Sequence, residues 1–160
     1  MYGYKVFLKG LIDSFGIKHE IGKIYKVDGE VKWSKNGFHF CKRPEDTLRN
    51  FDDFNKELEI ALIEASGKIK EYDDEYYGYY DMYVAEEYKI LRVIPKEEIV
   101  ASIIESGNQL RQLRIAQRMK LTDEQAKQLM GITNEIDCAI RYHQYNEKDI
   151  YEKTYKKRLI

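Results

Sequence analysis

His39 and Cys41 are the two residues of this chain whose types and spacing most strongly suggest chemistry. They lie in the string GFHFC (37–41), which follows an asparagine in a turn dipeptide and precedes a proline suited to the first turn of a helix. Successive side chains of a strand point to opposite faces. We therefore expect His39 and Cys41 to share one face of a short strand, and Phe38 and Phe40 to pack into the core from the other.

A histidine and a cysteine on one face suggest either a metal site or a nucleophile. A zinc site usually needs four ligands, and the chain has only three His and two Cys, so such a site would combine this pair with His19 and a carboxylate. A Cys–His nucleophile is disfavoured because side chains two residues apart on a strand run parallel, about 7 Å apart at the backbone. The simpler interpretation is a buried Cys41 thiol beside a hydrogen-bonded His39, with no metal and with His19 in a polar surface loop.

A tyrosine-rich and acidic segment, EYDDEYYGYYDMY (71–83), is the second candidate site. Tyrosine gives a large, stiff contact area at low entropic cost and is common on binding surfaces. Neighbouring carboxylates could imitate a phosphate backbone toward a basic protein. We expect a long edge hairpin or a projecting loop here; the alternative is a self-packed hairpin with no partner. The candidate binding residues are Asp73, Asp74, Glu75, Tyr76, Tyr77, Tyr79 and Tyr80.

The composition favours a globular protein of the cytoplasm. The chain has 160 residues, of which 34% are charged, and its net charge of −1 gives no field that would attract nucleic acid. It has no apolar run near the roughly 18 residues of a membrane span, and its start lacks the pattern of an export signal. The two distant cysteines then indicate reduced thiols. Glycine-rich phosphate loops and the GxSxG, HExxH and CxxC strings are absent, so no familiar enzyme signature is present.

Residues 1–94 have mainly strand-like patterns. An Asp28-Gly29 dipeptide between alternating runs predicts a hairpin with a two-residue type I′ turn. A short helix is expected after Pro44, with Leu48 on its buried side. Further strand-like runs cover 4–12, 57–65 and 86–94.

From residue 95 the pattern changes to helices. Thr122 and Gln125 have the spacing of a capping box, and Gly107 is suited to the end of a helix. Four helices are expected: one over about 95–106, a second over about 108–120, a third that begins at the capping box, and a fourth over 134–145. The sequence thus predicts an α+β protein, with a mainly antiparallel β domain over 1–94 and a helical segment over 95–160.

The first part of the chain resembles an uncharacterised domain family of bacteriophages and prophages, over roughly residues 4–65. The resemblance rests on the unusual string GFH-x-C followed by P-x-D and on several glycines and a tyrosine before it. It implies a mobile-element setting and no known chemistry. The matching residues are Lys9-Gly10, Gly22, Tyr25, Gly29, Gly37 to Cys41, Pro44 and Asp46.

The order of three strings is also similar to that of the ADP-ribosyltransferase fold: FLKG, then GFHFC with a helix start, then AEEYKIL. On this resemblance Lys9, His39 and Glu86 or Glu87 would line a cleft for the nicotinamide part of NAD. The chain departs from that family because Lys9 stands where Arg or His is expected. Lysine cannot make the planar bidentate contact to a diphosphate that arginine makes.

We therefore expect a phage- or prophage-type cytoplasmic binding protein that acts on host machinery as a counter-defence inhibitor. It would bind stoichiometrically, either to a host protein through the tyrosine segment or to a nucleotide-type ligand near His39. No cofactor, no membrane and no direct contact with nucleic acid are expected, and the oligomeric state is open. The alternatives are an ADP-ribosyltransferase-like enzyme that uses NAD, and a structural or accessory phage domain in which GFHFC is only core.

Overall fold

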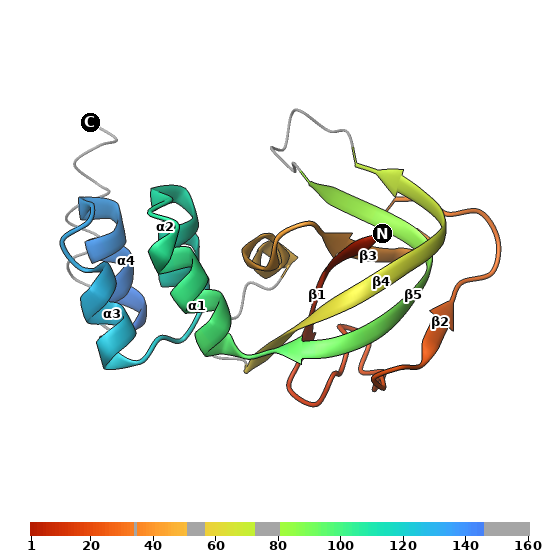
Figure 1. Ribbon diagram of the computed structural model, residues 1–160, viewed down its shortest axis with the longest axis horizontal. Helices are drawn as coiled ribbons and strands as arrows, with labels where there is room; N and C mark the ends of the chain where they lie inside the picture. Colours follow the sequence, from red (N-terminus) through yellow and green to blue (C-terminus); the bar gives the residue numbers. More distant parts are fainter. Residues whose placement is uncertain (34, 51–56, 73–80, 146–160) are drawn as a thin grey trace. The chain divides into compact units, whose positions relative to one another are not determined.

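The computed structural model describes residues 1–33, 35–50, 57–72 and 81–145 (Figure 1). The chain divides into two compact units, each described by itself: a β unit that ends at Lys96 and a helical unit from Glu97 onward. The β unit contains β1 (Tyr2–Leu8), β2 (Ile24–Lys26), β3 (Phe38–Cys41), the 3-10 helix η1 (Pro44–Asn50), β4 (Leu58–Glu71) and β5 (Met82–Ile94). The helices that follow are α1 (Lys96–Glu105), α2 (Gln109–Arg118), α3 (Asp123–Leu129) and α4 (Asn134–His143).

Four of the strands in the β unit close into a ring. The strand order is β2-β5-β3-β1-β4, and β4 pairs with β5 as well, so that β1, β3, β5 and β4 surround a common interior. All of these pairings are antiparallel. Figure 1 shows β4 and β5 as a long, curved pair. The β1–β3 seam is the weakest part of the ring, with one residue pair, Tyr4 with Cys41.

Strand alternation gives the ring an inner and an outer face. On β3, Phe40 is opposite Tyr83 and belongs to the core, and Phe38 packs against it, as predicted. His39 and Cys41 are on the outer face, and the Cys41 thiol is fully buried, which confirms the buried-thiol interpretation. The buried core cluster consists of Phe7, Leu11, Phe40, Ala61, Ile63, Ala65, Tyr83, Ala85, Tyr88 and Ile90.

The type I′ hairpin predicted at Asp28-Gly29 is wrong. The strand before the turn, β2, pairs with β5 instead of with the residues after the turn, and the Val27 N–H donates to the Glu86 carbonyl. Gly29 has a φ of +89°, but Asp28 is not among the residues with positive φ, and a type I′ turn needs both. The Asn36 side chain donates to the Asp28 carbonyl and holds the loop in another shape. Long-range pairing with β5 therefore overrides the local turn signal.

The two long strands extend beyond the predicted ones. β4 continues to Glu71 and β5 begins at Met82, so both run into the tyrosine-rich segment. The predictions for 73–80 fall outside the described residues. The structure does describe both ends of this segment, at Tyr72 and Asp81.

The helices begin where local signals predict them. The Thr122 side chain accepts the Gln125 N–H and the Gln125 side chain accepts the Thr122 N–H, which is the predicted capping box of α3. Gly107 follows α1 with a φ of +62°, a backbone conformation that suits glycine. The α+β class is therefore confirmed. In the part of the chain that the structure describes, no helix is long and apolar enough to cross a membrane.

Candidate functional site

Three aromatic side chains from separate segments meet on the outer face of the β unit. Trp33 precedes β3, His39 lies on β3, and Tyr72 follows β4. The Trp33 and Tyr72 rings stack with their centroids 3.8 Å apart, and the Trp33 and His39 rings meet edge to face at 4.5 Å. All three side chains are half-buried, so each keeps some exposed area. We call these three residues the aromatic surface.

The electrostatic surroundings keep the His39 ring neutral. Burial, with a smaller effect of the Lys5 cation, lowers the pKa of His39 to about 4. A neutral imidazole can donate one hydrogen bond and accept another. Near pH 7 the aromatic surface therefore offers planar rings and neutral polar groups, and the histidine adds no positive charge to it.

Lys5 lies on the inner face of β1, beside Phe7. Its Nζ donates to the His39 carbonyl at 3.1 Å, and lies 5.8 Å from the centroid of the Phe7 ring and 6.0 Å from that of Tyr88. Burial lowers the pKa of Lys5 to about 8, although the Asp13 carboxylate and Cys41 act in the opposite direction. The amine spans the β1–β3 seam where the two strands share a single residue pair. Its contacts thus give it a structural role.

A hydrogen-bonded chain of three side chains crosses the same interior. The Tyr88 hydroxyl lies 2.6 Å from His19 Nδ1, and His19 Nε2 lies 2.9 Å from Asp13 Oδ2. The other Asp13 oxygen accepts the N–H groups of Phe15 and Ile17. Burial raises the pKa of Asp13, but the His19 hydrogen bond and these two backbone donors outweigh burial, and the pKa is lowered. The carboxylate therefore stays ionised and fixes the loop around it.

The Asp13–His19–Tyr88 chain has the order of acid, base and hydroxyl that occurs in nucleophilic catalysis. Tyr88, however, is fully buried, and its burial, with the nearby Tyr25 and Asp13, raises the pKa of its phenol. A phenol that is both buried and harder to ionise is a poor nucleophile. The chain of hydrogen bonds is instead a clasp that ties the loop after β1 to β5. His19 is only 5% exposed, so the prediction of a surface position for it is wrong.

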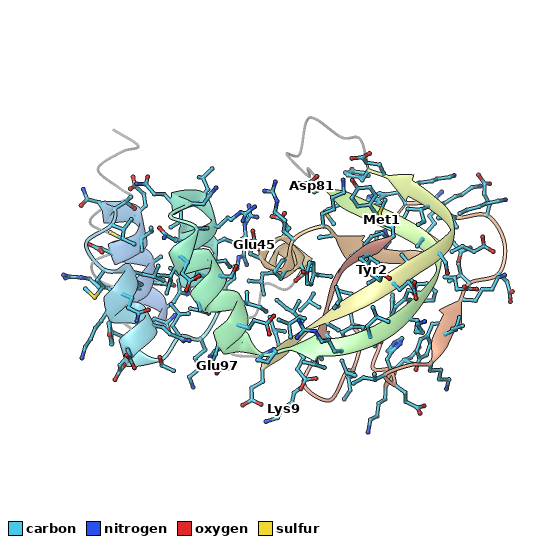
Figure 2. The ribbon with its side chains drawn as sticks, viewed as in Figure 1. Met1, Tyr2, Lys9, Glu45, Asp81 and Glu97 are labelled. Carbon is cyan, nitrogen blue, oxygen red and sulfur yellow. The ribbon has the colours of Figure 1, made fainter. Side chains whose placement is uncertain are left out.

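The residues predicted for an NAD-type cleft have separate local partners. Lys9 is exposed just beyond the end of β1, and its Nζ is 2.6 Å from a carboxylate oxygen of Glu57 (Figure 2). Glu86 lies 3.4 Å from Lys26 Nζ. Glu87 accepts a hydrogen bond from a serine hydroxyl on β4. Each of the three thus has its own partner, and none of these contacts involves His39.

The tyrosines and acids of the predicted binding segment lie outside the described residues, and only its flanks can be placed. At one end, Tyr72 belongs to the aromatic surface. At the other end, Asp81 has a φ of +63° and its carboxylate lies 3.4 Å from the Arg43 guanidinium. The candidates outside the described residues are Asp73, Asp74, Glu75, Tyr76, Tyr77, Tyr79 and Tyr80.

The metal alternative would need His19, His39 and Cys41 at one place. His19 is in the interior, whereas His39 and Cys41 are on the outer face of β3. Across residues 1–33, 35–50, 57–72 and 81–145, no group of three or more His, Cys, Asp or Glu side chains is placed to hold a metal ion.

Sequence reasoning missed Trp33, Lys5 and the clasp. The signal for Lys5 is its position two residues before Phe7 in a strand, which puts both on one face. Trp33 carried no local signal, because its stacking partner Tyr72 is distant in sequence. The same is true of His19 and Tyr88, which the sheet brings together across 69 positions of the chain.

A comparison with protein families matches residues 1–102 to DUF7666, a family described as a domain of unknown function. The matched span contains every strand of the β unit, the clasp and the aromatic surface. No curated protein and no solved structure matches the chain. Since the match covers more than half of its length, the protein belongs to the DUF7666 family.

Proposed function

We propose that this protein works by stoichiometric binding to a host protein, and that the aromatic surface is part of its contact area. The setting we propose is the host cytoplasm, where it acts as a phage- or prophage-type counter-defence inhibitor. That setting rests on the resemblance of the GFH-x-C and P-x-D strings to a phage and prophage family. The binding mode rests on the arrangement of Trp33, His39 and Tyr72.

The contact of Trp33 with both His39 and Tyr72 is the observation that carries the proposal. The ring centroid of Trp33 lies 4.5 Å from that of His39 and 3.8 Å from that of Tyr72, which directly precedes the predicted binding residues of the tyrosine segment. Tryptophan and tyrosine dominate the energetics of many interfaces because they bury a large area and lose little entropy. Stacked rings are also fixed before a partner arrives, which reduces the cost of ordering them on binding.

The charges next to the surface support a protein partner more than a free nucleotide. The neutral His39 ring offers no cation to a phosphate. Glu71 is exposed at the end of β4, and Asp81 follows the tyrosine segment. Both carboxylates lie close along the chain to Tyr72 or to its backbone partner Met82, and they suit a partner that presents basic or polar groups.

The test is a pull-down of tagged protein from bacterial lysate, followed by titration of the purified captured partner. Mass spectrometry identifies both proteins and small molecules that co-purify. We expect one host protein at a one-to-one ratio, and we expect Trp33→Ala with Tyr72→Ala to weaken its binding at least roughly a hundredfold, as the loss of two aromatic hot spots does.

Two controls separate binding from folding. Tyr2→Ala removes another exposed aromatic side chain from the same unit, and should leave binding unchanged. Thermal unfolding of each variant shows whether the β unit remains intact. If Trp33→Ala lowers the melting temperature strongly, Tyr72→Ser alone takes its place, because Tyr72 lies at the end of β4 and not in the core cluster.

Two outcomes would contradict the proposal. Full binding by a folded double variant would remove the aromatic surface from the contact area. A co-purifying nucleotide without any protein partner would move the function to a ligand-binding or NAD-using protein. Labelling of a lysate protein in the presence of NAD, lost in Glu87→Gln, would then be the next assay.

A further inference from the structure

Across residues 1–33, 35–50, 57–72 and 81–145, β2 has a neighbouring strand on one edge and none on the other. β2 pairs with β5 on one side only, with Tyr25 opposite Tyr88. In an antiparallel pair, every second residue of a strand directs its N–H and C=O to the neighbouring strand. The Val27 N–H donates to the Glu86 carbonyl of β5, so the N–H and C=O of Tyr25, two residues earlier, also point to β5. The N–H and C=O groups of Ile24 and Lys26 then point away from the sheet.

Large apolar side chains are exposed on β2 and on the segment before it. Ile21 and Ile24 are 57% and 59% exposed, and on the preceding loop Ile17 and Phe15 are 56% and 88% exposed. The Glu20 N–H donates to the Tyr25 hydroxyl, so the segment before β2 is held against the strand. Proteins usually protect an open strand edge with polar or charged side chains. Lys26 does so here, but the exposed Ile21 and Ile24 add apolar area beside it, which is typical of a contact surface.

The loop that carries Phe15 is held rigidly by the clasp. Asp13 fixes the N–H groups of Phe15 and Ile17, and His19 connects the carboxylate to Tyr88 in the core. An exposed aromatic side chain on an ordered loop loses little entropy when it binds. The clasp thus holds the backbone of the loop from which the exposed Phe15 side chain projects.

We propose that the β2 edge, with Ile21 and Ile24, is a docking site for an extended, acidic segment of a partner protein, which adds a strand to the sheet. The free groups of Ile24 and Lys26 are two residues apart, which is the spacing of an antiparallel neighbour strand. Lys18, Lys23 and Lys26 are exposed near the edge; Lys23 and Lys26 lie 3.3 Å and 3.4 Å from the carboxylates of Glu20 and Glu86. These three lysines outnumber the two carboxylates that pair with them, and they favour an acidic segment over a basic one. This surface is independent of the aromatic surface and of its partner.

The pattern of polar groups selects this occupant over a lipid surface. A membrane would cover the isoleucines and attract the lysines, but it would leave the N–H and C=O groups of Ile24 and Lys26 without hydrogen bonds in an apolar layer, which is strongly unfavourable. A strand satisfies these groups and covers the side chains at the same time. It is therefore the occupant that the geometry favours.

The experiment uses the full-length protein and a display library of seven-residue random peptides. Selected peptides are titrated into isotope-labelled protein, and amide hydrogen exchange is followed by NMR. We expect enrichment of peptides with alternating acidic residues, and slower exchange of the Ile24 and Lys26 amides on binding. The Tyr25 and Val27 amides are already bonded to β5, so they should exchange slowly both in the free protein and in its complex with the peptide.

A single proline substitution in β2 is the decisive test. Ile24→Pro removes one outward N–H without removing a hydrogen bond of the β2–β5 ladder, because proline is tolerated at the edge. It should weaken the selected peptides at least roughly tenfold, which corresponds to one lost buried hydrogen bond. Ile24→Thr keeps the N–H and removes apolar area, and separates the two contributions. Melting curves and the NMR signals of the core residues show whether each variant is folded.

Four results would overturn the proposal. The first is a selection in which no peptide prefers the parent protein over folded Ile24→Pro, and the second is binding without protection of the Ile24 and Lys26 amides. The third is a concentration-dependent dimer that Ile24→Pro abolishes, since a second copy would then be the occupant. The fourth is binding to vesicles of phosphatidylserine and phosphatidylcholine that Phe15→Ala abolishes and Ile24→Pro does not.

Discussion

Lys5 is the residue with the most unusual environment in the β unit. Its amine lies between aromatic rings and donates to one backbone carbonyl, and burial lowers its pKa from 10.5 to about 8. The unfolded chain therefore holds a proton on this amine over a range where the folded protein has lost it. The same residue lowers the pKa of His39 on the other side of the sheet. One cation thus affects both the stability of the seam and the neutrality of the aromatic surface.

The first prediction concerns Lys5→Met. Between pH 8 and 10.5 the unfolded state binds more protons than the folded state, so the stability of the parent protein should rise with pH in that window. Lys5→Met should lack this rise. Removing the lowered pKa alone favours the variant at pH 7 by roughly 3 kcal/mol, and the lost hydrogen bond to the His39 carbonyl offsets about 1 kcal/mol of that gain. Urea unfolding at pH 7 and pH 10 measures the difference. Lys9→Met, at an exposed lysine, is the control; equal pH profiles for parent and Lys5→Met would contradict the account.

The second prediction concerns acidification. The pKa of His39 is lowered from 6.5 to about 4, so the unfolded state takes up a proton first as the pH falls. The contribution of His39 to stability is complete above pH 6.5 and is lost between pH 6.5 and 4. A His39→Gln variant should lose less stability than the parent over this range. Parallel denaturation curves at pH 7, 5.5 and 4.5 give the comparison, and identical losses in both proteins would refute it.

The third prediction concerns the clasp. His19→Ala leaves the Tyr88 hydroxyl and the Asp13 carboxylate without their shared partner, and should cost about 2–4 kcal/mol of unfolding free energy. Tyr88→Phe removes one hydrogen bond and should cost about half as much. Because the clasp also holds the loop, amide exchange of Phe15 and Ile17 should accelerate in His19→Ala. Unchanged protection of both amides would show that the loop is ordered without the clasp.

At the scale of elements, the sequence predicted the features that depend on nearby residues and missed those that depend on distant strand pairing. The capping box at Thr122 and Gln125, the short helix after Pro44 and the inward phenylalanines depend on neighbours within a few residues, and all were predicted correctly. The Asp28-Gly29 hairpin failed because β2 has a better partner in β5, more than 60 positions away. Ring closure, the clasp and the Trp33–Tyr72 stack depend on the same kind of distant pairing, which no local pattern encodes.

The fourth prediction concerns the close approach of β1 and β3. A Cβ at Gly3 would lie 2.4 Å from a ring carbon of Phe40 and 2.9 Å from the Cys41 carbonyl oxygen. Gly3→Ala should therefore destabilise the β unit by about 1–3 kcal/mol, the usual cost of overpacking. Gly10→Ala is the matched control, because Gly10 has open space around it and its φ of +84° costs only about 1 kcal/mol. A smaller loss at Gly3 than at Gly10 in urea unfolding would contradict this packing.

At the scale of the whole molecule, the β unit has its own core. Every residue of the core cluster comes from the strands and loops before Ile94, and the DUF7666 match ends soon afterwards, at residue 102. Both proposed contact surfaces belong to this unit. The aromatic surface and the β2 edge are formed by different residues, so one unit could hold two partners or two parts of one partner.

The fifth prediction follows from that organisation. A fragment of residues 1–102 should fold cooperatively, with a strand-rich far-UV circular dichroism spectrum and sharp near-UV bands from its packed aromatic residues. Thermal unfolding with both signals measures this directly. A fragment that lacks near-UV bands, or unfolds without a cooperative transition, would show that the β unit needs the helical segment for its core.

The affinity of the captured host partner for the parent protein and for the Trp33→Ala, Tyr72→Ala double variant is the most direct test of the central claim. Isothermal titration of the purified pair gives both stoichiometry and affinity. We predict one partner per chain, and binding at least roughly a hundredfold weaker in the folded double variant, with Tyr2→Ala unchanged. Equal affinity of the parent and the folded double variant would contradict the assignment of the aromatic surface as the binding site.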